Sequence, residues 1–138
     1  KKPSTVLADR SSLRILMSNV LSNAHKHKAS NTRVNLFLVD RGENVIELTI
    51  ENQTRDEREI DVSRLFEKYY RDRSSSGISG TGLGLYIVKR IAEQSNMQVI
   101  LECKNSVFKV VIRINRAGSI ESKEERVGLL PLNHEGLV

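Results

Sequence analysis

The sequence predicts a two-layer α/β sandwich, in which helices cover one face of a mainly antiparallel mixed sheet. Three observations support this fold class. Two segments have the apolar spacing of helices, four have the short apolar pattern of strands, and the strands occur as two consecutive pairs joined by brief polar turns. With 138 residues, of which 38% are hydrophobic, the chain is long enough to form a single core.

The first helix is predicted over residues 13–24, where apolar side chains recur every three or four positions. Asp9, Ser11 or Ser12 is suited to cap its N-terminus, because each carries a side-chain oxygen that accepts from the first free N–H groups. The same apolar spacing resumes at Gly82. A second helix is therefore predicted to begin there.

Two antiparallel strand pairs are predicted, one from residues 34–39 with 45–50 and one from 99–103 with 108–114. The second strand alternates apolar and polar residues, so one of its faces meets the core. Asn52 occupies the next inward position along that strand. A polar side chain is thus expected where the apolar face ends.

The remaining segments carry weaker signals. Residues 65–70 form an apolar and aromatic patch that predicts one or two helical turns, and residues 71–81, with four serines and two glycines, predict a mobile loop. Residues 117–138 are charged and then punctuated by glycine and proline, which indicates a C-terminal tail or linker after a domain formed by residues 1–116.

Charge and composition narrow the classes of partner. The formal net charge of +5 favours a polyanion, but the aromatic residues do not alternate with basic ones as a single-strand nucleic-acid surface requires. No run of 18 apolar residues is present, so the fragment is expected to be soluble and cytoplasmic. These features favour a nucleotide over nucleic acid as the anionic ligand.

Asn19, Asn23 and Lys26 form a polar stripe along the first predicted helix, because they are spaced four and three positions apart. An amide oxygen is a suitable ligand for Mg²⁺, and a lysine can neutralise phosphate. The alternative interpretation is an ordinary solvated helix face.

A glycine-rich segment at residues 80–85 joins the predicted loop to the second helix. Glycines at a helix N-terminus let phosphate approach the free N–H groups. The segment is not a P-loop, since no Lys-Ser or Lys-Thr follows, and its glycine spacing does not match a dinucleotide-binding fingerprint. A simple hinge before the helix is the other interpretation.

These motifs occur in an order that resembles the catalytic ATP-binding domain of two-component sensor histidine kinases, a branch of the GHKL superfamily. The matching segments are Asn-Val-Leu-Ser-Asn-Ala-His-Lys at 19–26, Phe-Glu-Lys-Tyr-Tyr-Arg at 66–71 and Gly-Thr-Gly-Leu-Gly-Leu at 80–85. The resemblance extends over residues 6–115. It implies a Bergerat-type ATP-binding fold with a mobile ATP lid, and ATP and Mg²⁺ as cofactors.

The resemblance also implies roles for individual residues. Asn23 would hold Mg²⁺, Asn19 and Lys26 would order metal or phosphate, Asn52 would face adenine, and Arg71 would reach the γ-phosphate. Asn19, Lys26 and Arg71 are therefore the expected catalytic residues. Other residues expected at the nucleotide are Phe66, Tyr70, Gly80, Thr81, Gly82, Leu83 and Gly84.

The implied activity is transfer of the γ-phosphoryl group to a histidine on a separate dimerisation and phosphoacceptor domain, followed by relay to a response regulator. The fragment would be monomeric, whereas the parent protein would be a homodimer and could be membrane-anchored. None of His25, His27 and His134 lies in an acceptor-like segment, so the acceptor is expected elsewhere.

One motif departs from the family pattern. Asn52-Gln53-Thr54-Arg55-Asp56 replaces the usual Asp-x-Gly-x-Gly segment at adenine. A neutral acceptor contributes roughly 0.5–1.5 kcal/mol against about 1.5–3 for a charged one, so weaker binding is expected. A nucleotide sensor without phosphotransfer is the main alternative function. A chaperone- or topoisomerase-like ATPase is disfavoured because Asn19 stands where those enzymes carry a general-base glutamate.

Overall fold

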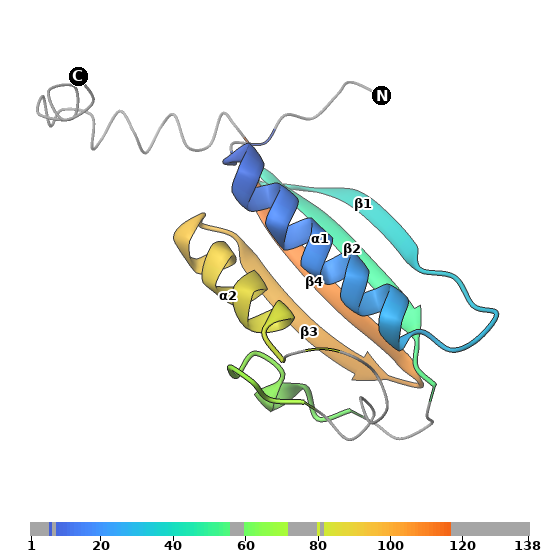
Figure 1. Ribbon diagram of the computed structural model, residues 1–138. Helices are drawn as coiled ribbons and strands as arrows, with labels where there is room; N and C mark the ends of the chain where they lie inside the picture. Colours follow the sequence, from blue (N-terminus) through green and yellow to red (C-terminus); the bar gives the residue numbers. More distant parts are fainter. Residues whose placement is uncertain (1–5, 7, 56–59, 72–79, 81, 117–138) are drawn as a thin grey trace, which may run out of the picture.

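The computed structural model describes residues 6, 8–55, 60–71, 80 and 82–116. Its helices cover one face of a four-stranded sheet with strand order β1-β2-β4-β3 (Figure 1). The described strands all pair antiparallel, and the predicted two-layer sandwich is confirmed. The helical elements are α1 (Arg10–His27), the 3-10 turn η1 (Val62–Arg64) and α2 (Gly84–Gln94), and the strands are β1 (Asn35–Gly42), β2 (Val45–Gln53), β3 (Gln98–Lys104) and β4 (Val107–Asn115).

Helix α1 begins after Asp9, whose carboxylate accepts a 2.8 Å hydrogen bond from the backbone N–H of Ser12. Leu16, Val20 and Ala24 recur every fourth residue and are buried against the sheet. The helix extends three residues beyond the predicted range at each end. Apolar spacing could not reveal these outer turns, because their residues are mostly polar or charged.

The sheet core lies between the central strands and the two helices. Strand β2 pairs along its whole length with β4, and Ile50, Val110 and Ile112 are buried beneath the helices. Both predicted hairpins are confirmed. The β1–β2 turn places Glu43 and Asn44 in the left-handed region of backbone space.

The segment before the predicted loop differs from the expectation for residues 65–70. The structure instead has a 3-10 helix at Val62–Arg64, followed by turns. Asp61 caps it by accepting a 3.0 Å hydrogen bond from the Ser63 N–H. Tyr69 adopts a φ of +66°, which is incompatible with a continuing helix. The helical turn therefore lies nearer the N-terminus than expected, at the residues that Asp61 caps.

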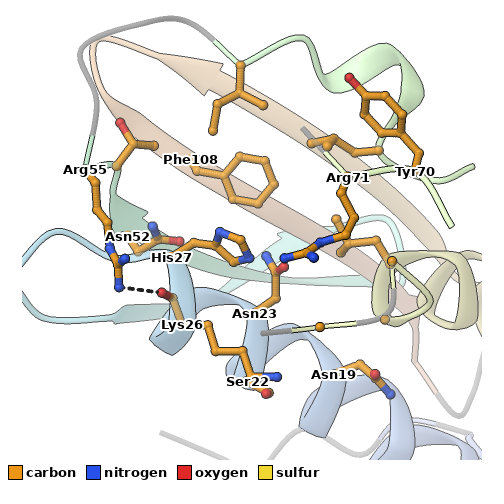
Figure 2. Close-up of a pocket in the computed structure, with 17 residues that line it drawn as sticks. Asn19, Ser22, Asn23, Lys26, His27, Asn52, Arg55, Tyr70, Arg71 and Phe108 are labelled. Carbon is orange, nitrogen blue, oxygen red and sulfur yellow. Dashed lines mark hydrogen bonds between the residues drawn. The ribbon is translucent and has the colours of Figure 1, made fainter. Parts of the chain in front are cut away.

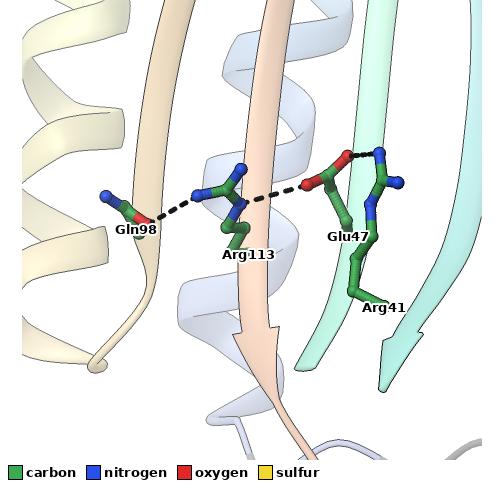
Figure 3. A network of polar contacts seen from close by, with 4 residues as sticks. All are labelled: Arg41, Glu47, Gln98 and Arg113. Atoms are coloured by element: carbon green, nitrogen blue, oxygen red, sulfur yellow. Dashed lines mark hydrogen bonds and ion pairs between the residues drawn. The ribbon is translucent and has the colours of Figure 1, made fainter. Parts of the chain in front are cut away.

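The sheet face opposite the helices carries a polar network around Glu47 (Figure 3). The Glu47 carboxylate lies 2.6 Å from an Arg41 nitrogen and 3.0 Å from Arg113 Nε, and Arg113 also donates to Gln98. Hydrogen bonds from Arg41 and then Arg113 lower the pKa of Glu47. The network connects all four strands at one end of the sheet.

Candidate functional site

A cavity of about 300 Å³ opens between α1, the ends of β2 and β4, and the segment leading into α2. Figure 2 shows polar side chains from these elements pointing into it. The lining residues are Asn19, Ser22, Asn23, Lys26, His27, Asn52, Thr54, Arg55, Ile60, Leu65, Tyr70, Arg71, Gly80, Gly82, Gly84, Leu85 and Phe108.

Helix α1 supplies one wall through the predicted polar stripe. Asn19, Asn23 and Lys26 all line the cavity, so the stripe is not simply a solvated helix face. The Asn19 amide nitrogen donates to the Ile15 carbonyl at 2.9 Å, which fixes the side chain along the helix. The spacing of helix residues thus brings two amide groups and one ammonium group to one wall.

Asn52 reaches the cavity from the end of β2 and is only 2% exposed. Its Nδ2 donates to the Gln53 carbonyl at 3.1 Å, and the same carbonyl accepts from the Ala29 N–H at 2.8 Å. Only the nitrogen end of an amide can face a carbonyl oxygen at this distance, which sets the side-chain orientation. The other end, Oδ1, is buried without a hydrogen-bond partner and is therefore an acceptor that needs a donor.

Arg55 braces the segment that follows Asn52 against α1. Its guanidinium donates to the carbonyl oxygen of Lys26 at 2.9 Å (Figure 2) and to the carbonyl oxygen of Lys28 at 3.2 Å. These carbonyls belong to the C-terminal end of α1, where the helix leaves acceptors unpaired. Arg55 therefore connects the Asn52 end of the cavity with the helix that carries Lys26.

The glycine-rich segment is held close to the residues that precede the predicted loop. Gly82 has a φ of +73°, and a Cβ placed on it would lie 2.7 Å from the backbone carbon of Tyr69. The Tyr69 N–H donates to the Gly82 carbonyl at 3.0 Å. Position 82 thus requires glycine both for its conformation and for this backbone contact.

Most predicted site residues meet at the cavity, but three need separate mention. Phe66 does not line it; the ring packs against the core, with the Lys89 ammonium 5.4 Å from its centroid. Leu83 is the N-cap of α2 and is also outside the lining. Thr81 lies outside the described residues, as do residues 72–79 of the predicted lid and the predicted tail at 117–138. The roles assigned to these residues stay predictions.

Several lining residues were not singled out from the sequence. His27 was considered only as a phosphoacceptor candidate, and Phe108 has the sequence pattern of any core residue of a strand. The sheet register pairs Phe108 with Asn52, so its place beside the cavity depends on how β2 and β4 align. The others are Ser22, Thr54, Arg55, Ile60, Leu65 and Leu85.

The cavity is electrostatically one-sided. Lys26, Arg55 and Arg71 line it, and the lining contains no Asp or Glu among the residues that the structure describes. Nor do the described residues contain a group of three or more His, Cys, Asp or Glu side chains placed to hold a metal ion. The site is suited to a phosphate-bearing anion, whose oxygens would have to supply most ligands of any bound metal.

No helix in the described part of the chain is both long and apolar enough to cross a membrane.

The α/β sandwich and the basic cavity define a domain of the nucleotide-binding α/β sandwich class. Residues 8–123 match the family described as Histidine kinase-, DNA gyrase B-, and HSP90-like ATPase. The chain belongs to this family, as a histidine kinase-type, ATP-binding domain.

Similar proteins agree with this assignment. The sensor-like histidine kinase SenX3 of Mycolicibacterium smegmatis is 35% identical over 98 residues, which is 70% of this chain and 25% of SenX3. The probable sensor kinase SilS of Salmonella typhimurium is 30% identical over 117 residues, 83% of this chain and 23% of SilS. The chain therefore spans about a quarter of the length of each of these relatives.

Solved structures show the same fold. The mycobacterial sensor histidine kinase MprB aligns with a TM-score of 0.68 and 25% identity, covering 80% of this chain and 74% of that one. Full-length ShkA, solved in complex with AMPPNP, aligns with a TM-score of 0.65 and 22% identity, covering 83% of this chain and 24% of ShkA.

Proposed function

We propose that this domain binds Mg-ATP and donates the γ-phosphoryl group to a histidine on a separate dimerisation and phosphoacceptor domain of the parent protein, for relay to a response regulator. The observation that carries the proposal is the buried, unpartnered Oδ1 of Asn52, a residue that lines a cavity whose charged lining residues are basic. Asn52 requires a ligand group that donates a hydrogen bond, and the basic lining residues favour a ligand group that is anionic.

Adenine and triphosphate together meet both requirements. The exocyclic amino group of adenine donates a hydrogen bond, as Asn52 Oδ1 requires, and Phe108 and Leu65 offer apolar surface for the base. Lys26 and Arg71 would neutralise phosphate charge, while the backbone of residues 80–84 would receive phosphate oxygens. In this proposal, the base of ATP meets Asn52 and its phosphates meet the basic residues.

Asn23 is suited to contribute an amide oxygen to Mg²⁺, which the phosphates would hold on its other sides. Bound Mg²⁺ would supply neutralisation of phosphate charge during transfer. The role of this chain's own residues is to fix the base, align the phosphates and keep their charge balanced. Phosphoryl transfer then depends mainly on the position of the acceptor histidine.

The test of nucleotide binding is calorimetric titration of the whole 138-residue chain with a non-hydrolysable ATP analogue, with and without Mg²⁺. Saturable binding that is tighter with Mg²⁺ is the expected result, because metal and basic residues share the phosphate charge. No binding at millimolar analogue would overturn the proposal.

The test of the metal role is Asn23→Ala in a longer chain that includes the acceptor domain. Formation of phosphohistidine should fall by about a hundredfold or more if this amide helps to position the metal. Ser18→Ala, an exposed change on the same helix outside the cavity lining, is the matched control. Undiminished transfer by Asn23→Ala would exclude the role.

A second function is favoured by the neutral Asn52 at the position where the family pattern has aspartate. A degenerate nucleotide-binding module would bind ATP and regulate a partner without transferring phosphate. Saturable ATP binding together with no phosphohistidine in the longer chain distinguishes this function from the kinase.

A further inference from the structure

Strand β1 leaves an apolar edge of the sheet uncovered. All eight of its residues are exposed, and Leu36, Phe37, Leu38 and Val39 retain 52%, 49%, 70% and 39% of their accessible surface. The first and third of these side chains lie on the face that the helices cover, and the other two lie on the opposite face. Figure 1 shows β1 at the margin of the sheet, beyond the helices. A partner that covers this surface must therefore contact both faces of the strand.

The outer backbone of β1 has no strand beside it in the part of the chain that the structure describes, where β1 pairs with β2 alone. Residues 35–39 contain no charge and no proline, which commonly protect an edge strand from pairing. A further strand would bind the outer N–H and C=O groups and would cover apolar side chains on both faces at once. The chemistry of this edge thus favours a strand as the partner.

The uncharged segment is suited to pair with a second copy of itself. A two-fold axis that brings two β1 strands together edge to edge makes them antiparallel. Phe37 is the middle residue of the segment 35–39. If Phe37 lies opposite its own counterpart, Leu36 lies opposite Leu38 of the second copy, and Asn35 lies opposite Val39. The large apolar side chains then meet one another on each face.

Charge favours this register over the neighbouring ones. Paired side chains share a face, so two-fold symmetry permits shifts only in steps of two residues. One such shift would place Asp40 opposite Leu36, and the shift in the other direction would place Arg33 opposite Val39. The register centred on Phe37 avoids both of these contacts.

Opposite charges meet at both ends of the same pairing. Arg33 of each copy comes near the β1–β2 turn of the other copy, and this turn carries the exposed Glu43. Asp40 and Arg41, which precede the turn, already form ion pairs within their own chain. The edge is therefore complementary to itself both in its apolar centre and in its charged ends.

The other edge of the sheet does not offer the same contact, because β3 exposes Glu102 and Lys104 near its end. Among the described strands, each copy thus has one apolar edge, so pairing stops at two copies and does not continue into a filament. One strand per copy buries less than the roughly 1,200–2,000 Å² of a stable complex. A dissociation constant of about 10–100 µM is therefore expected.

We propose that two copies of this chain associate through β1, antiparallel across a two-fold axis at Phe37, and so join two four-stranded sheets into one. The resemblance implies a monomeric fragment, and this pairing departs from that expectation. Strand β1 contributes no residue to the cavity lining, so the association leaves the candidate site open. Dimerisation can therefore be measured independently of nucleotide binding.

The first test is sedimentation equilibrium of the whole 138-residue chain, without nucleotide, from about 5 µM to about 500 µM. Leu38→Lys should raise the dissociation constant at least about tenfold, because it places a charge in the apolar contact. Leu38 is 70% exposed, so the substitution is not expected to disturb the fold. Ile15→Lys is the matched control, since it replaces an apolar side chain that is 48% exposed on α1. This control should associate like the natural chain.

Three results of this experiment would overturn the proposal. The first is a natural chain that stays monomeric over the whole range, and the second is growth beyond a dimer. The third is equal association of the Leu38→Lys and Ile15→Lys variants. Amide protection of residues 35–39 that does not change with concentration would assign the edge to another segment of the same chain and would also overturn it.

A disulfide test checks the register. In a Cys103→Ser background, Phe37→Cys should form a disulfide-linked dimer on oxidation, because the two cysteines lie opposite each other. Asn35→Cys is the control on the same strand and the same face. Its counterpart would be displaced by four residues, or about 13 Å along the strand, which is beyond the roughly 7 Å limit for a disulfide. Equal cross-linking of both variants, or none with Phe37→Cys, would contradict the proposed pairing.

Discussion

In the proposed function, Asn52 determines which base the cavity binds at one end. Its amide nitrogen is held by the Gln53 carbonyl, which leaves its buried oxygen as an acceptor without a hydrogen-bond partner at a residue that lines the cavity. In this proposal, a purine with a 6-amino group would donate a hydrogen bond to that oxygen, whereas a 6-oxo purine would place a second acceptor against it. Discrimination between the two bases therefore does not require a carboxylate.

We predict that Asn52→Leu weakens binding of an ATP analogue by about threefold to tenfold, the loss of roughly 0.5–1.5 kcal/mol. Binding of the corresponding inosine analogue should change less, because it gains nothing from the acceptor. Gln53→Leu is the control, since it retains the backbone carbonyl and alters only an exposed side chain. Calorimetry with both analogues measures the difference, and an equal loss for both would contradict the role of Asn52.

Gly82 and Gly80 belong to the same glycine-rich segment but have different structural demands. Gly82→Ala should reduce the free energy of unfolding by about 1–3 kcal/mol, because it combines a positive φ with a clash against Tyr69. Gly80→Ala should have little effect on stability, since an added Cβ meets nothing within 4 Å. Denaturant unfolding of both variants checks the prediction, which fails if they are equally stable.

At the level of elements, Arg55 joins the segment after β2 to the end of α1. We expect Arg55→Met to lower nucleotide affinity by about threefold to tenfold and stability by about 1 kcal/mol, because two carbonyl groups lose their donor. Arg33→Met removes an exposed arginine outside the cavity lining and serves as control. If both variants bind alike, the connection does not position the site.

The ion pairs of Glu47 make the free energy of unfolding depend on pH. The two arginines hold the pKa of Glu47 below its ordinary value of 4.5 in the folded chain, so the unfolded chain takes up this proton first as the pH falls. The stabilisation is therefore present above pH 4.5 and is lost as the pH falls towards the lowered value.

Glu47→Gln should lower the free energy of unfolding at neutral pH by about 1–3 kcal/mol, and the difference from the natural chain should shrink at about pH 3. Glu102→Gln, an exposed change on β3, should leave the pH dependence unaltered. Urea unfolding across this pH range measures both. A constant difference at all pH values would show that Glu47 acts through packing alone.

The positive charge of the molecule should strengthen binding of the phosphate end of the ligand more than binding of the base. The chain carries a net charge of +5, and the basic residues lining the cavity would meet the phosphates. Raising the salt concentration from about 50 mM to about 500 mM should weaken binding of the ATP analogue about tenfold but leave adenosine binding almost unchanged. Parallel titrations test this, and equal salt dependence would place the phosphates away from the basic residues.

The sequence alone determined the helices, both hairpins, the polar stripe on α1 and the inward position of Asn52. These features follow local periodicity, since a repeat of 3.6 or 2 residues sets which side chains share a face. It also indicated the family through the order of three short motifs. It could not show that Phe66 lies outside the cavity lining, because a motif gives neighbours along the chain and not side-chain packing.

Only the tertiary structure brought distant residues into contact. Phe108 lies at the cavity because of the β2–β4 register, and Arg55 because it binds carbonyls at the end of α1. Glu47 is buried on the sheet face opposite the helices. The exposure of β1 likewise arose because the two helices cover only part of the sheet. These outcomes depend on strand order and helix placement, which local sequence patterns do not specify.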